Sequence, residues 1–409
     1  MAPSGTPARP RLTVDQYRER VLAAAVFGAW PASETVATEA ALGRVLAAEA
    51  RAGIPIPRWP NAAMDGFGIA YRDGAPLVEH AVVADIPAGR LTPQTVGPGQ
   101  AARIMTGAPT PPGVDTVVPL EDCLADGRTV RFVGPIRAGQ HVRLAGEDVE
   151  PGARVVAAGT LLGARHLAAI AAVGVDRVTV ARRPRVGLVT TGDELTAPGD
   201  ELGPASIYDS NGPYLAGAVA EAGGRVTSRS RAGDTARSLT RALDEAAAGA
   251  DLVLVTGGVS VGDRDIVREL LVGAGGQAVT VAMQPGKPQA SAQWAGVPVL
   301  AFPGNPVGAA VSFACFARPV LAAMLARAPQ PPSWAVVGTG WPSPSGRRQF
   351  MPVATRPRDD GRWLARPASP GGSGSHLVAS LAGADAWAVI DEAVTLVRAG
   401  DVVPLVALA

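Results

Sequence analysis

Residues 252–265 read Leu-Val-Leu-Val-Thr-Gly-Gly-Val-Ser-Val-Gly-Asp-Arg-Asp, a short apolar run followed by a glycine-rich loop. The apolar run predicts a buried strand over 252–255, and the pattern of residues 266–271 predicts a helix after the loop. Glycine lets a loop backbone approach a ligand closely, and the N-terminus of a following helix favours an anion. The stretch therefore predicts one strand–loop–helix unit with a ligand-binding loop.

The same rhythm repeats over residues 184–328. We expect strands at 186–190, 225–229, 252–255, 279–283 and 297–302, and helices at 212–222, 236–248, 266–271 and 308–326. Continuous apolar strands that alternate with helices predict a doubly wound α/β domain, a parallel sheet covered on both faces. Ligands of such sheets bind beyond the carboxyl ends of the strands.

The loops that follow these strands share a composition. They are Thr191-Gly192-Asp193-Glu194, the loop from Thr256 to Asp265, Pro285-Gly286-Lys287-Pro288 and Pro303-Gly304-Asn305-Pro306. If the strands are neighbours, all four loops converge on one edge of the sheet. Carboxylates beside backbone amides and a lysine suit a phosphate bridged to a hard divalent cation such as Mg²⁺. The polar candidates are Asp193, Glu194, Ser260, Asp265, Lys287 and, after the strand at 225–229, Asp234.

Each feature also has an ordinary structural interpretation. A single glycine turn is typical of any strand–helix connection, and a lone carboxylate often caps a helix or lies in solvent. Asp234, directly before Thr235, is a good candidate for a helix N-cap. The functional hypothesis rests on the four loops together.

Residues outside the α/β region follow other patterns. Helices are expected at 13–26, with Thr13 as cap, and at 33–50, whereas residues 53–159 alternate short strands with Pro and Gly. A helix at 161–173 leaves open whether this β region is an insertion. From residue 333 onward short strands return, which predicts a small all-β C-terminal domain.

Composition excludes several classes of protein. The 409 residues carry 37 Lys+Arg against 36 Asp+Glu, so no basic surplus indicates binding to nucleic acid or to an acidic membrane. Two cysteines and four dispersed histidines form neither a disulfide framework nor a zinc motif, and they suit the cytoplasm. The apolar stretch 307–326 contains Arg318, so we expect a buried helix and no membrane span.

Lys287 is the single lysine among these 37 basic residues. An arginine-rich composition is typical of a GC-rich genome, and one lysine can survive by chance. The alternative is that position 287 needs a compact ammonium rather than a planar guanidinium, as a phosphate contact does. Its bracketing prolines, Pro285 and Pro288, favour the second interpretation.

Eight motifs, in this order along nearly the whole chain, resemble the molybdopterin molybdenumtransferase family, which is related to the C-terminal domain of gephyrin. The motifs are Asn61-Ala62-Ala63-Met64-Asp65-Gly66-Phe67, Arg103-Ile104-Met105-Thr106-Gly107-Ala108, Gly146-Glu147-Asp148, Thr191-Gly192-Asp193-Glu194-Leu195, Tyr208-Asp209-Ser210-Asn211, Gly257-Gly258-Val259-Ser260-Val261-Gly262, Pro285-Gly286-Lys287-Pro288 and Pro303-Gly304-Asn305-Pro306.

The resemblance implies four parts: a helical and linker region (1–52 and 148–183), an inserted β domain (53–147), the α/β domain (184–328) and a small C-terminal β domain (329–409). It also implies a homodimer whose site lies between the α/β domain of one subunit and the β insertion of the other. The implied reaction transfers molybdate to adenylylated molybdopterin, which a molybdopterin adenylyltransferase supplies, with Mg²⁺-dependent release of AMP. The implied catalytic residues are Asp65, Thr106, Glu194, Asp234, Asp265 and Lys287, with Glu194, Asp234 and Asp265 on Mg²⁺. The implied substrate-binding residues are Thr191, Gly192, Asp193, Asn211, Gly257, Gly258, Ser260, Gly286, Pro303 and Pro306.

The chain departs from the family pattern at several positions. Gln284 stands where the family often has a second lysine, and Gln289 to Ala292 replace a glycine-containing stretch, so we expect a looser approach of the backbone there. Gln349 stands where an acid is common. Two alternatives stay open: a pterin-binding or scaffolding relative without turnover, and a Mg²⁺-dependent phosphoanhydride hydrolase that uses the α/β domain alone.

Overall fold

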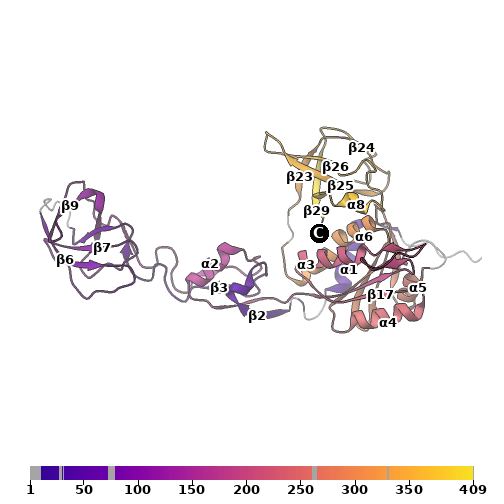
Figure 1. The fold of residues 1–409 in the computed structure, drawn as a ribbon, viewed down its shortest axis with the longest axis horizontal. Helices are drawn as coiled ribbons and strands as arrows, with labels where there is room; N and C mark the ends of the chain where they lie inside the picture. The colour runs from indigo at the N-terminus through magenta and orange to yellow at the C-terminus, as the bar shows by residue number, and fades with distance from the viewer. Residues whose placement is uncertain are drawn as a thin grey trace, which may run out of the picture. The chain divides into compact units, whose positions relative to one another are not determined.

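The computed structural model describes residues 11–26, 30, 32–71, 79–259, 265–328 and 331–408 (Figure 1). Contacts divide the chain into two compact units, Met1–Glu34 with Ala181–Ala409 and Thr35–Val180. The larger unit holds the α/β sheet and a second sheet from the C-terminal residues, and the smaller unit is mainly β.

A seven-stranded mixed sheet forms the centre of the larger unit, in the order β1-β19-β21-β22-β18-β14-β17. Neighbours β17, β14, β18 and β22 are parallel, whereas β21 is antiparallel to both β22 and β19. The bounds are β1 Arg11–Leu12, β14 Arg185–Thr191, β17 Arg225–Ala232, β18 Leu252–Thr256, β19 Gln277–Val281, β21 Pro288–Trp294 and β22 Val297–Phe302.

The strand order reverses at β14, because β17 pairs with one side of it and β18 with the other. In a doubly wound sheet such a reversal opens a crevice at the carboxyl ends of the strands, where ligands bind. The loops that follow β14 and β18 therefore lie at the position that this topology favours for a site.

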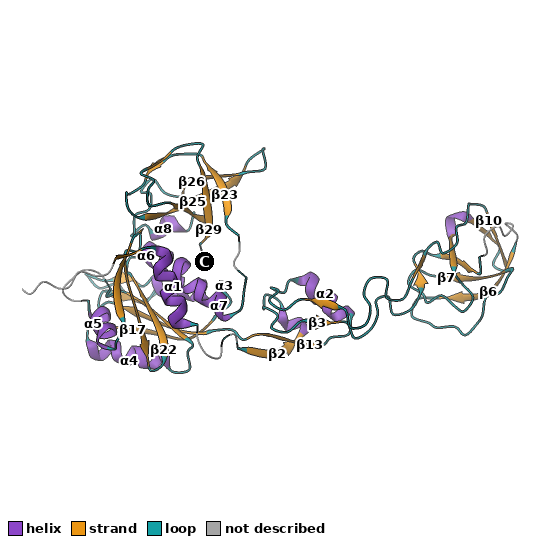
Figure 2. Ribbon diagram, turned by 180° about the vertical axis from the view of Figure 1, so that it is seen from behind, coloured by secondary structure: helices purple, strands orange, loops and turns teal. Residues whose placement is uncertain are grey.

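Helices cover both faces of the sheet (Figure 2). Apolar residues of α1, α3, α6, η3 and α7 pack on one face, and those of α4 and α5 pack on the other. The bounds are α1 Val14–Ala25, α3 Asn211–Glu221, α4 Ala236–Ala247, α5 Ile266–Gly273, α6 Pro306–Ser312, the π-helical η3 Phe313–Ala317 and α7 Arg318–Met324. The doubly wound α/β class expected from the sequence is confirmed.

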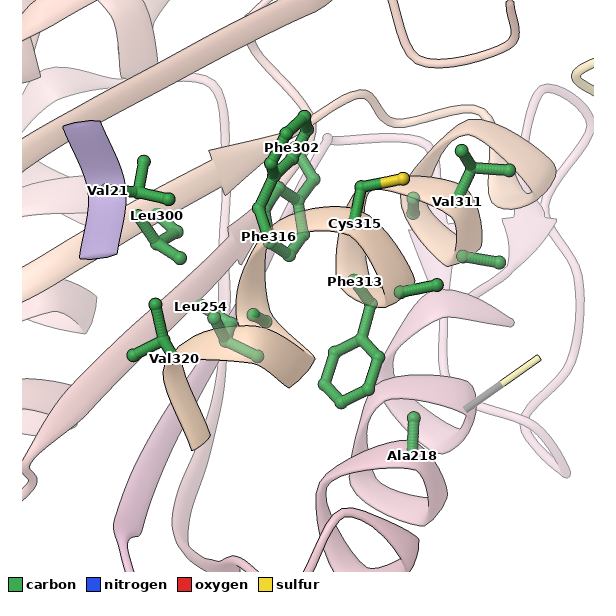
Figure 3. Packing of buried hydrophobic residues seen from close by; sticks show 14 of the residues in the cluster. Val21, Ala218, Leu254, Leu300, Phe302, Val311, Phe313, Cys315, Phe316 and Val320 are labelled. Carbon is green, nitrogen blue, oxygen red and sulfur yellow. The ribbon is translucent and has the colours of Figure 1, made fainter. Parts of the chain in front are cut away.

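The core on the first face joins α1 to the last helices of the domain (Figure 3). Val21 of α1, Phe302 of β22 and Phe316 of η3 belong to one buried cluster, and the Tyr17 and Phe316 rings meet edge to face at 4.8 Å. The helical stretch Pro306–Met324 is long and apolar enough to span a membrane, but 78% of its 18-residue apolar window is buried inside this fold. It is the buried core helix that its Arg318 indicated.

At the amino ends of the parallel strands, Asp251 pairs with Arg182 and Arg185, and we call these three residues the clamp. Asp251, just before β18, accepts hydrogen bonds from the guanidinium of Arg182 at 3.0 and 3.1 Å and from the backbone N–H of Arg185 at 2.7 Å. Burial alone would raise the pKa of the Asp251 carboxyl, but the hydrogen bonds from Arg182 and Arg185 outweigh burial and hold its pKa below the ordinary value.

The C-terminal residues form a six-stranded sheet with the order β20-β25-β26-β23-β29-β27. Its first strand, β20, comes from the α/β region and pairs Met283 with Arg348 and Gln284 with Gln349 of β25. The bounds are β20 Met283–Gln284, β23 Ser333–Val337, β24 Trp341–Pro342, β25 Arg348–Pro357, β26 Trp363–Pro367, α8 Val378–Leu381, β27 Ala386–Ile390, β28 Leu396–Val397 and β29 Val402–Ala407. The pairing through β20 brings the residues around 347 to the loop at 284–288.

The smaller unit contains a six-stranded sheet, β8-β5-β7-β6-β10-β9, and a set of short pairs around one helix. The sheet strands are β5 Gly66–Ile69, β6 His80–Ile86, β7 Gln100–Ile104, β8 Thr116–Pro119, β9 Cys123–Ala125 and β10 Thr129–Phe132. The remaining elements of the smaller unit are β2 Ser33–Ala37, η1 Thr38–Ala41, β3 Ala50–Arg51, β4 Asn61–Ala62, η2 Leu120–Asp122, β11 Val142–Arg143, β12 Arg154–Val156, α2 Ala164–Ala172 and β13 Arg177–Ala181. One further strand pair, β15 Leu195–Thr196 with β16 Ile207–Tyr208, belongs to the larger unit.

Three expectations differ from the structure. Residues 33–50 are not a helix: they form β2, η1 and β3, and their apolar side chains pack against α2 and β13. The N-terminal helix packs on the α/β sheet, so residues up to Glu34 group with the larger unit and not with residues 148–180. The strand β21 is antiparallel, so the sheet is mixed where a wholly parallel one was expected.

Of the two expected helix caps, one is confirmed and the other is wrong. Thr13 caps α1 as expected, because its hydroxyl accepts from the Gln16 N–H while the Gln16 side chain accepts from the Thr13 N–H. The cap of α4 is Thr235 and not Asp234, since the Thr235 hydroxyl accepts from the Ser238 N–H. The Asp234 carboxylate therefore does not cap α4.

Candidate functional site

The glycine loops converge on one edge of the α/β sheet, as the sequence indicated. Thr190 of β14 is level with Thr256 of β18, and Thr256 is level with Phe302 of β22, so the loops after these strands are neighbours. Since β21 is antiparallel, its first residue, Pro288, lies at the same edge and carries the loop at 285–287 there.

A pocket of about 370 Å³ lies at this edge. Its walls come from the residues after β18 (Gly258), the segment 283–288, the segment 303–308, and the C-terminal sheet region with Arg347 and residues 373–375. Of the predicted residues, the pocket brings together Gly258, Gly286, Lys287 and Pro303. The last wall was not expected, because none of the predicted site residues lies in the C-terminal domain.

The lining is electropositive. Among the residues that the structure describes, it contains two cations, Lys287 and Arg347, and no carboxylate. Ser373, Ser375 and Asn305, whose side chains are neutral hydrogen-bonding groups, also line the pocket. Two cations without a counter-ion in a concave site favour an anionic ligand.

A buried glutamine anchors the loop that carries Lys287. The Gln289 side-chain amide donates to the Gly286 carbonyl and to the Ser312 hydroxyl, both at 2.7 Å, and Ser312 donates to the Gly308 carbonyl at 2.7 Å. The network ties Gly286 to the first turn of α6. Gln289 is 1% exposed, so it fixes the loop from beneath. That the backbone at 289–292 approaches a ligand less closely stays a prediction.

The other two glutamine departures also contact pocket residues. Gln284 brings no charge, but its carbonyl oxygen accepts from the Arg347 guanidinium at 3.1 Å. Gln349 is buried and donates to the Ser373 hydroxyl at 3.0 Å. Each glutamine therefore positions a group that lines the pocket.

Predicted acidic residues lie along the same edge, after β14 and β17. Asp193 and Asp234 bridge the two loops, because each carboxylate accepts from the backbone N–H of the other residue, at 3.0 and 3.4 Å. The Glu194 carboxylate folds over Gly192, where a Cβ atom would lie 2.6 Å from Glu194 Oε1. Within the described ranges, no three or more carboxylates, histidines or cysteines form a group that could hold a metal, so Glu194, Asp234 and Asp265 do not form a three-carboxylate site.

Thr191, Gly257 and Asn211 form the packing behind the loops. Gly257 has φ +99°, and a Cβ atom there would lie 2.6 Å from the Thr191 carbonyl oxygen. Asn211, at the start of α3, donates from its side chain to the Gly304 carbonyl at 2.7 Å. These contacts hold the loops after β14, β18 and β22 together.

Three predicted residues remain, Pro306, Asp265 and Ser260. Pro306 is the first residue of α6, and Asp265 is the residue before α5, 9% exposed. Ser260 lies outside the described residues.

Asp65 and Thr106 come together in the smaller unit. Thr106 donates its backbone N–H and its hydroxyl to Asp65 Oδ1, at 2.6 and 2.7 Å. These hydrogen bonds, the hydroxyl's first, hold the pKa of the Asp65 carboxyl below its ordinary value, and Arg103 adds to the effect. The two predicted residues therefore form one exposed carboxylate–hydroxyl pair, between β4 and β5 and after β7.

Arg347, Ser373 and Ser375 line the pocket, but they are not among the predicted site residues. The signal that could have found the serines is the stretch Gly371-Gly372-Ser373-Gly374-Ser375, whose composition resembles the other loops of the site. Arg347 shows no such local pattern, because only the pairing of β20 with β25 brings it to the pocket.

Comparisons with known proteins agree along the chain. Residues 12–174 match the MoeA N-terminal region (domain I and II), residues 187–323 a probable molybdopterin binding domain, and residues 335–408 the MoeA C-terminal region (domain IV). The chain is 38% identical over 349 residues to molybdopterin molybdenumtransferase 2 of Mycobacterium tuberculosis, covering 82% of this chain and 86% of the relative. It is 38% identical to the Nostoc molybdopterin molybdenumtransferase over 71% of this chain and 69% of the relative. Among solved structures, a molybdopterin biosynthesis MoeA protein from Pyrococcus horikoshii superposes with a TM-score of 0.82 and 30% identity, over 98% of this chain and 100% of that one.

Proposed function

Because the chain belongs to the molybdopterin molybdenumtransferase family, and is thus a transferase of molybdenum cofactor biosynthesis, we propose that it inserts molybdate into adenylylated molybdopterin and releases AMP. The observation that carries this reaction is the pocket at the carboxyl edge of the sheet, lined by Lys287 and Arg347. Both the phosphate of the substrate and molybdate are oxyanions, and this pocket has the charge to bind one.

We propose that Lys287 contacts the oxyanion directly. The Gly286 loop holds its backbone close to α6 through Gln289, so the lysine stem starts from a fixed position. A compact ammonium can turn toward any oxygen of a tetrahedral oxyanion, whereas a guanidinium needs a planar pair of acceptors. This geometry supports a lysine at position 287.

We propose that Mg²⁺ binds at the neighbouring acidic loops. A site made by protein carboxylates alone does not fit the structure, because the described residues gather no three of them. Mg²⁺ usually takes one or two carboxylates, several waters and substrate phosphates. Glu194 and Asp234 suit that arrangement, since both are exposed at the carboxyl edge, and bound Mg²⁺ would neutralise phosphate charge as the anhydride breaks.

Oligomeric state, partner and location are part of the same proposal. We propose a homodimer in the cytoplasm that receives its substrate from a molybdopterin adenylyltransferase. The Asp65–Thr106 pair of the second subunit would then act on the reacting group. The mass of the purified chain in solution, measured by light scattering, tests the dimer.

The reaction is tested by AMP release from adenylylated molybdopterin. The purified chain is incubated with the substrate and Mg²⁺, with and without molybdate, and the product is assayed by activation of an apo-molybdoenzyme. We expect molybdate to stimulate AMP release and the product to activate the apoenzyme. Substrate binding without AMP release would instead support a pterin-binding relative. AMP release that survives deletion of residues 53–147 would support a phosphoanhydride hydrolase that uses the α/β domain alone.

A further inference from the structure

We propose that Ser373 is an oxyanion-binding residue of the pocket, and that Gln349 is the positioning residue that makes its hydroxyl a hydrogen-bond donor to the ligand. The inference rests on the proposed function, because it takes the pocket to be the oxyanion site. Ser373 lines the pocket together with Lys287 and Arg347.

The orientation of the Gln349 side chain follows from its partners. Trp341 Nε1 lies 3.0 Å from Gln349 Oε1, and Gln349 Nε2 lies 3.0 Å from the Ser373 hydroxyl oxygen. An indole N–H only donates, so the group that faces Trp341 must be the carbonyl oxygen of the amide. The amide nitrogen must therefore face Ser373. Gln349 is 3% exposed and Trp341 is 6% exposed, so both hydrogen bonds are shielded from water.

This arrangement fixes the direction of the Ser373 hydrogen bond. The hydroxyl oxygen accepts from the amide, so its own hydrogen is not used in that bond. Among the described residues, the Ser373 hydroxyl is found to accept this hydrogen bond and to donate none. Because the residue lines the pocket, the hydroxyl hydrogen is available to an oxyanion bound there.

A carboxylate at position 349 would reverse the direction of the hydrogen bond between residue 349 and the Ser373 hydroxyl. In the Q349E variant, one carboxylate oxygen would accept from Trp341, and the other would present only an acceptor to Ser373. The Ser373 hydroxyl would then donate to that carboxylate and would turn its lone pairs toward the ligand. Q349E is therefore a nearly isosteric change that removes the donor from the pocket while the serine is still present.

The experiment is a double-mutant cycle on oxyanion affinity. The full chain, S373A, Q349E and Q349E/S373A are titrated by calorimetry with sodium molybdate and, separately, with inorganic phosphate, and the fold of each variant is checked by circular dichroism. We expect S373A to weaken binding about tenfold, the effect of one hydrogen bond to a charged group. S373T, which retains a hydroxyl, should recover most of the affinity. S343A removes another buried serine hydroxyl, outside the pocket lining, and should bind as the unmodified chain does.

Comparing the effect of Q349E on oxyanion affinity with and without Ser373 distinguishes a positioning role of Gln349 from the effect of the added charge. Q349E also adds a negative charge that repels an anion, and this repulsion persists when Ser373 is replaced by alanine. We therefore expect Q349E to weaken binding at least tenfold in the natural chain, and much less in the S373A background. A smaller effect of Q349E in the S373A background, with either molybdate or phosphate, supports the proposal. The oxyanion that shows this difference is the one that the Ser373 hydroxyl binds.

Two results overturn the proposal. Unchanged affinity of S373A for both oxyanions would do so, and so would equal losses from Q349E in the two backgrounds. The S373A result is sufficient if Q349E does not fold. K287A and R347A separate this failure from that of the proposed function: if they also leave both affinities unchanged, the pocket is not the oxyanion site, whereas a loss confined to them rejects only the role of Ser373 and Gln349.

Discussion

Thr106 donates two hydrogen bonds to a single carboxylate oxygen of Asp65, one from its backbone N–H at 2.6 Å and one from its hydroxyl at 2.7 Å. The pair joins two motifs that are 41 residues apart in sequence. Because both donors stabilise the charged form of the carboxyl, they lower its pKa, so Asp65 stays ionised to a lower pH than an ordinary aspartate does.

Replacing Thr106 by valine tests this relationship, because the change removes the hydroxyl and retains the backbone donor. We expect the Asp65 pKa to rise toward its ordinary value, measured from the carboxyl carbon chemical shift during a pH titration. If Asp65 acts as a carboxylate, the acidic limb of the activity profile should move to higher pH. T110V is the control, since the Thr110 hydroxyl contacts the Pro60 carbonyl and not Asp65. An Asp65 pKa that T106V leaves in place would contradict the assignment.

Lys287→Arg tests whether the pocket needs a compact cation. The substitution keeps the charge, but the guanidinium requires a planar arrangement of acceptors and more room within the loop bracketed by Pro285 and Pro288. We expect substrate affinity to fall about tenfold or more, and Lys287→Ala to weaken it further. Binding titrations with the substrate measure both. Equal affinity of the K287R variant and the natural chain would remove the argument from the single lysine.

Gly257→Ala tests the close approach of the loops after β14 and β18. A Cβ atom would lie 2.6 Å from the Thr191 carbonyl oxygen, and φ is +99°, so both space and conformation oppose alanine. We expect a loss of unfolding free energy of about 2 kcal/mol or more, together with reduced activity. Denaturant unfolding measures the first quantity.

Gly217→Ala is the matched control. Gly217 is an exposed residue inside α3, and a Cβ atom added there would have no atom within 4 Å apart from its chain neighbours and the backbone of its own helix. Alanine in a helix interior is favoured over glycine by about 0.5–1 kcal/mol, so this variant should be more stable than the natural chain. Similar effects of the two substitutions would show that the loop contact is not the cause.

Asp251→Asn tests the clamp at the other end of the sheet. The Asp251 side chain is 10% exposed and pairs with Arg182 and Arg185, so its loss leaves two guanidinium groups without their carboxylate. We expect a loss of roughly 2–4 kcal/mol of unfolding free energy at neutral pH. D359N, at an exposed aspartate, should change stability by less than about 0.5 kcal/mol.

The Asp251 contribution should also depend on pH in one direction. Its folded pKa is lowered, so the stabilisation is complete above the unfolded pKa of about 3.9 and is lost as the pH falls through the lower, folded value. The difference between the natural chain and D251N should therefore shrink below about pH 4. A difference that is constant from neutral to acidic pH would contradict an ionic clamp.

The sequence predicts the parts of this fold whose local pattern and tertiary role agree. The run 252–256 is apolar in its first four residues and is buried in the centre of the sheet, and Thr13 caps the helix that it was expected to cap. Residues 33–50 show the limit. Their apolar spacing fits a helix, but β-branched Thr35 and Val36 lie in a strand, and packing against β13 decides the outcome. The strand β21 was missed because it begins with proline and carries polar residues such as Gln289 and Ser291.

The same distinction applies to the site. Loops that follow strands can be placed from the sequence, because parallel topology brings their ends to one edge, and Gly258, Gly286, Lys287 and Pro303 all line the pocket. Arg347 lies directly before β25, a strand of a different sheet, and only the pairing of β25 with β20 places it there. Within the described residues Glu194, Asp234 and Asp265 form no three-carboxylate group. Asp193 and Asp234 accept from each other's backbone N–H, and Glu194 folds over Gly192.

The proposed function depends on one assignment, that the pocket beside Lys287 and Arg347 binds the oxyanion of a molybdenum insertion reaction. Anomalous diffraction at the molybdenum absorption edge, from crystals grown with molybdate and adenylylated molybdopterin, locates the metal without further assumptions. We predict a molybdenum peak inside this pocket, with oxygens in hydrogen-bonding distance of the Lys287 ammonium. A molybdenum peak elsewhere on the protein, with this pocket filled by solvent, would show the assignment to be wrong.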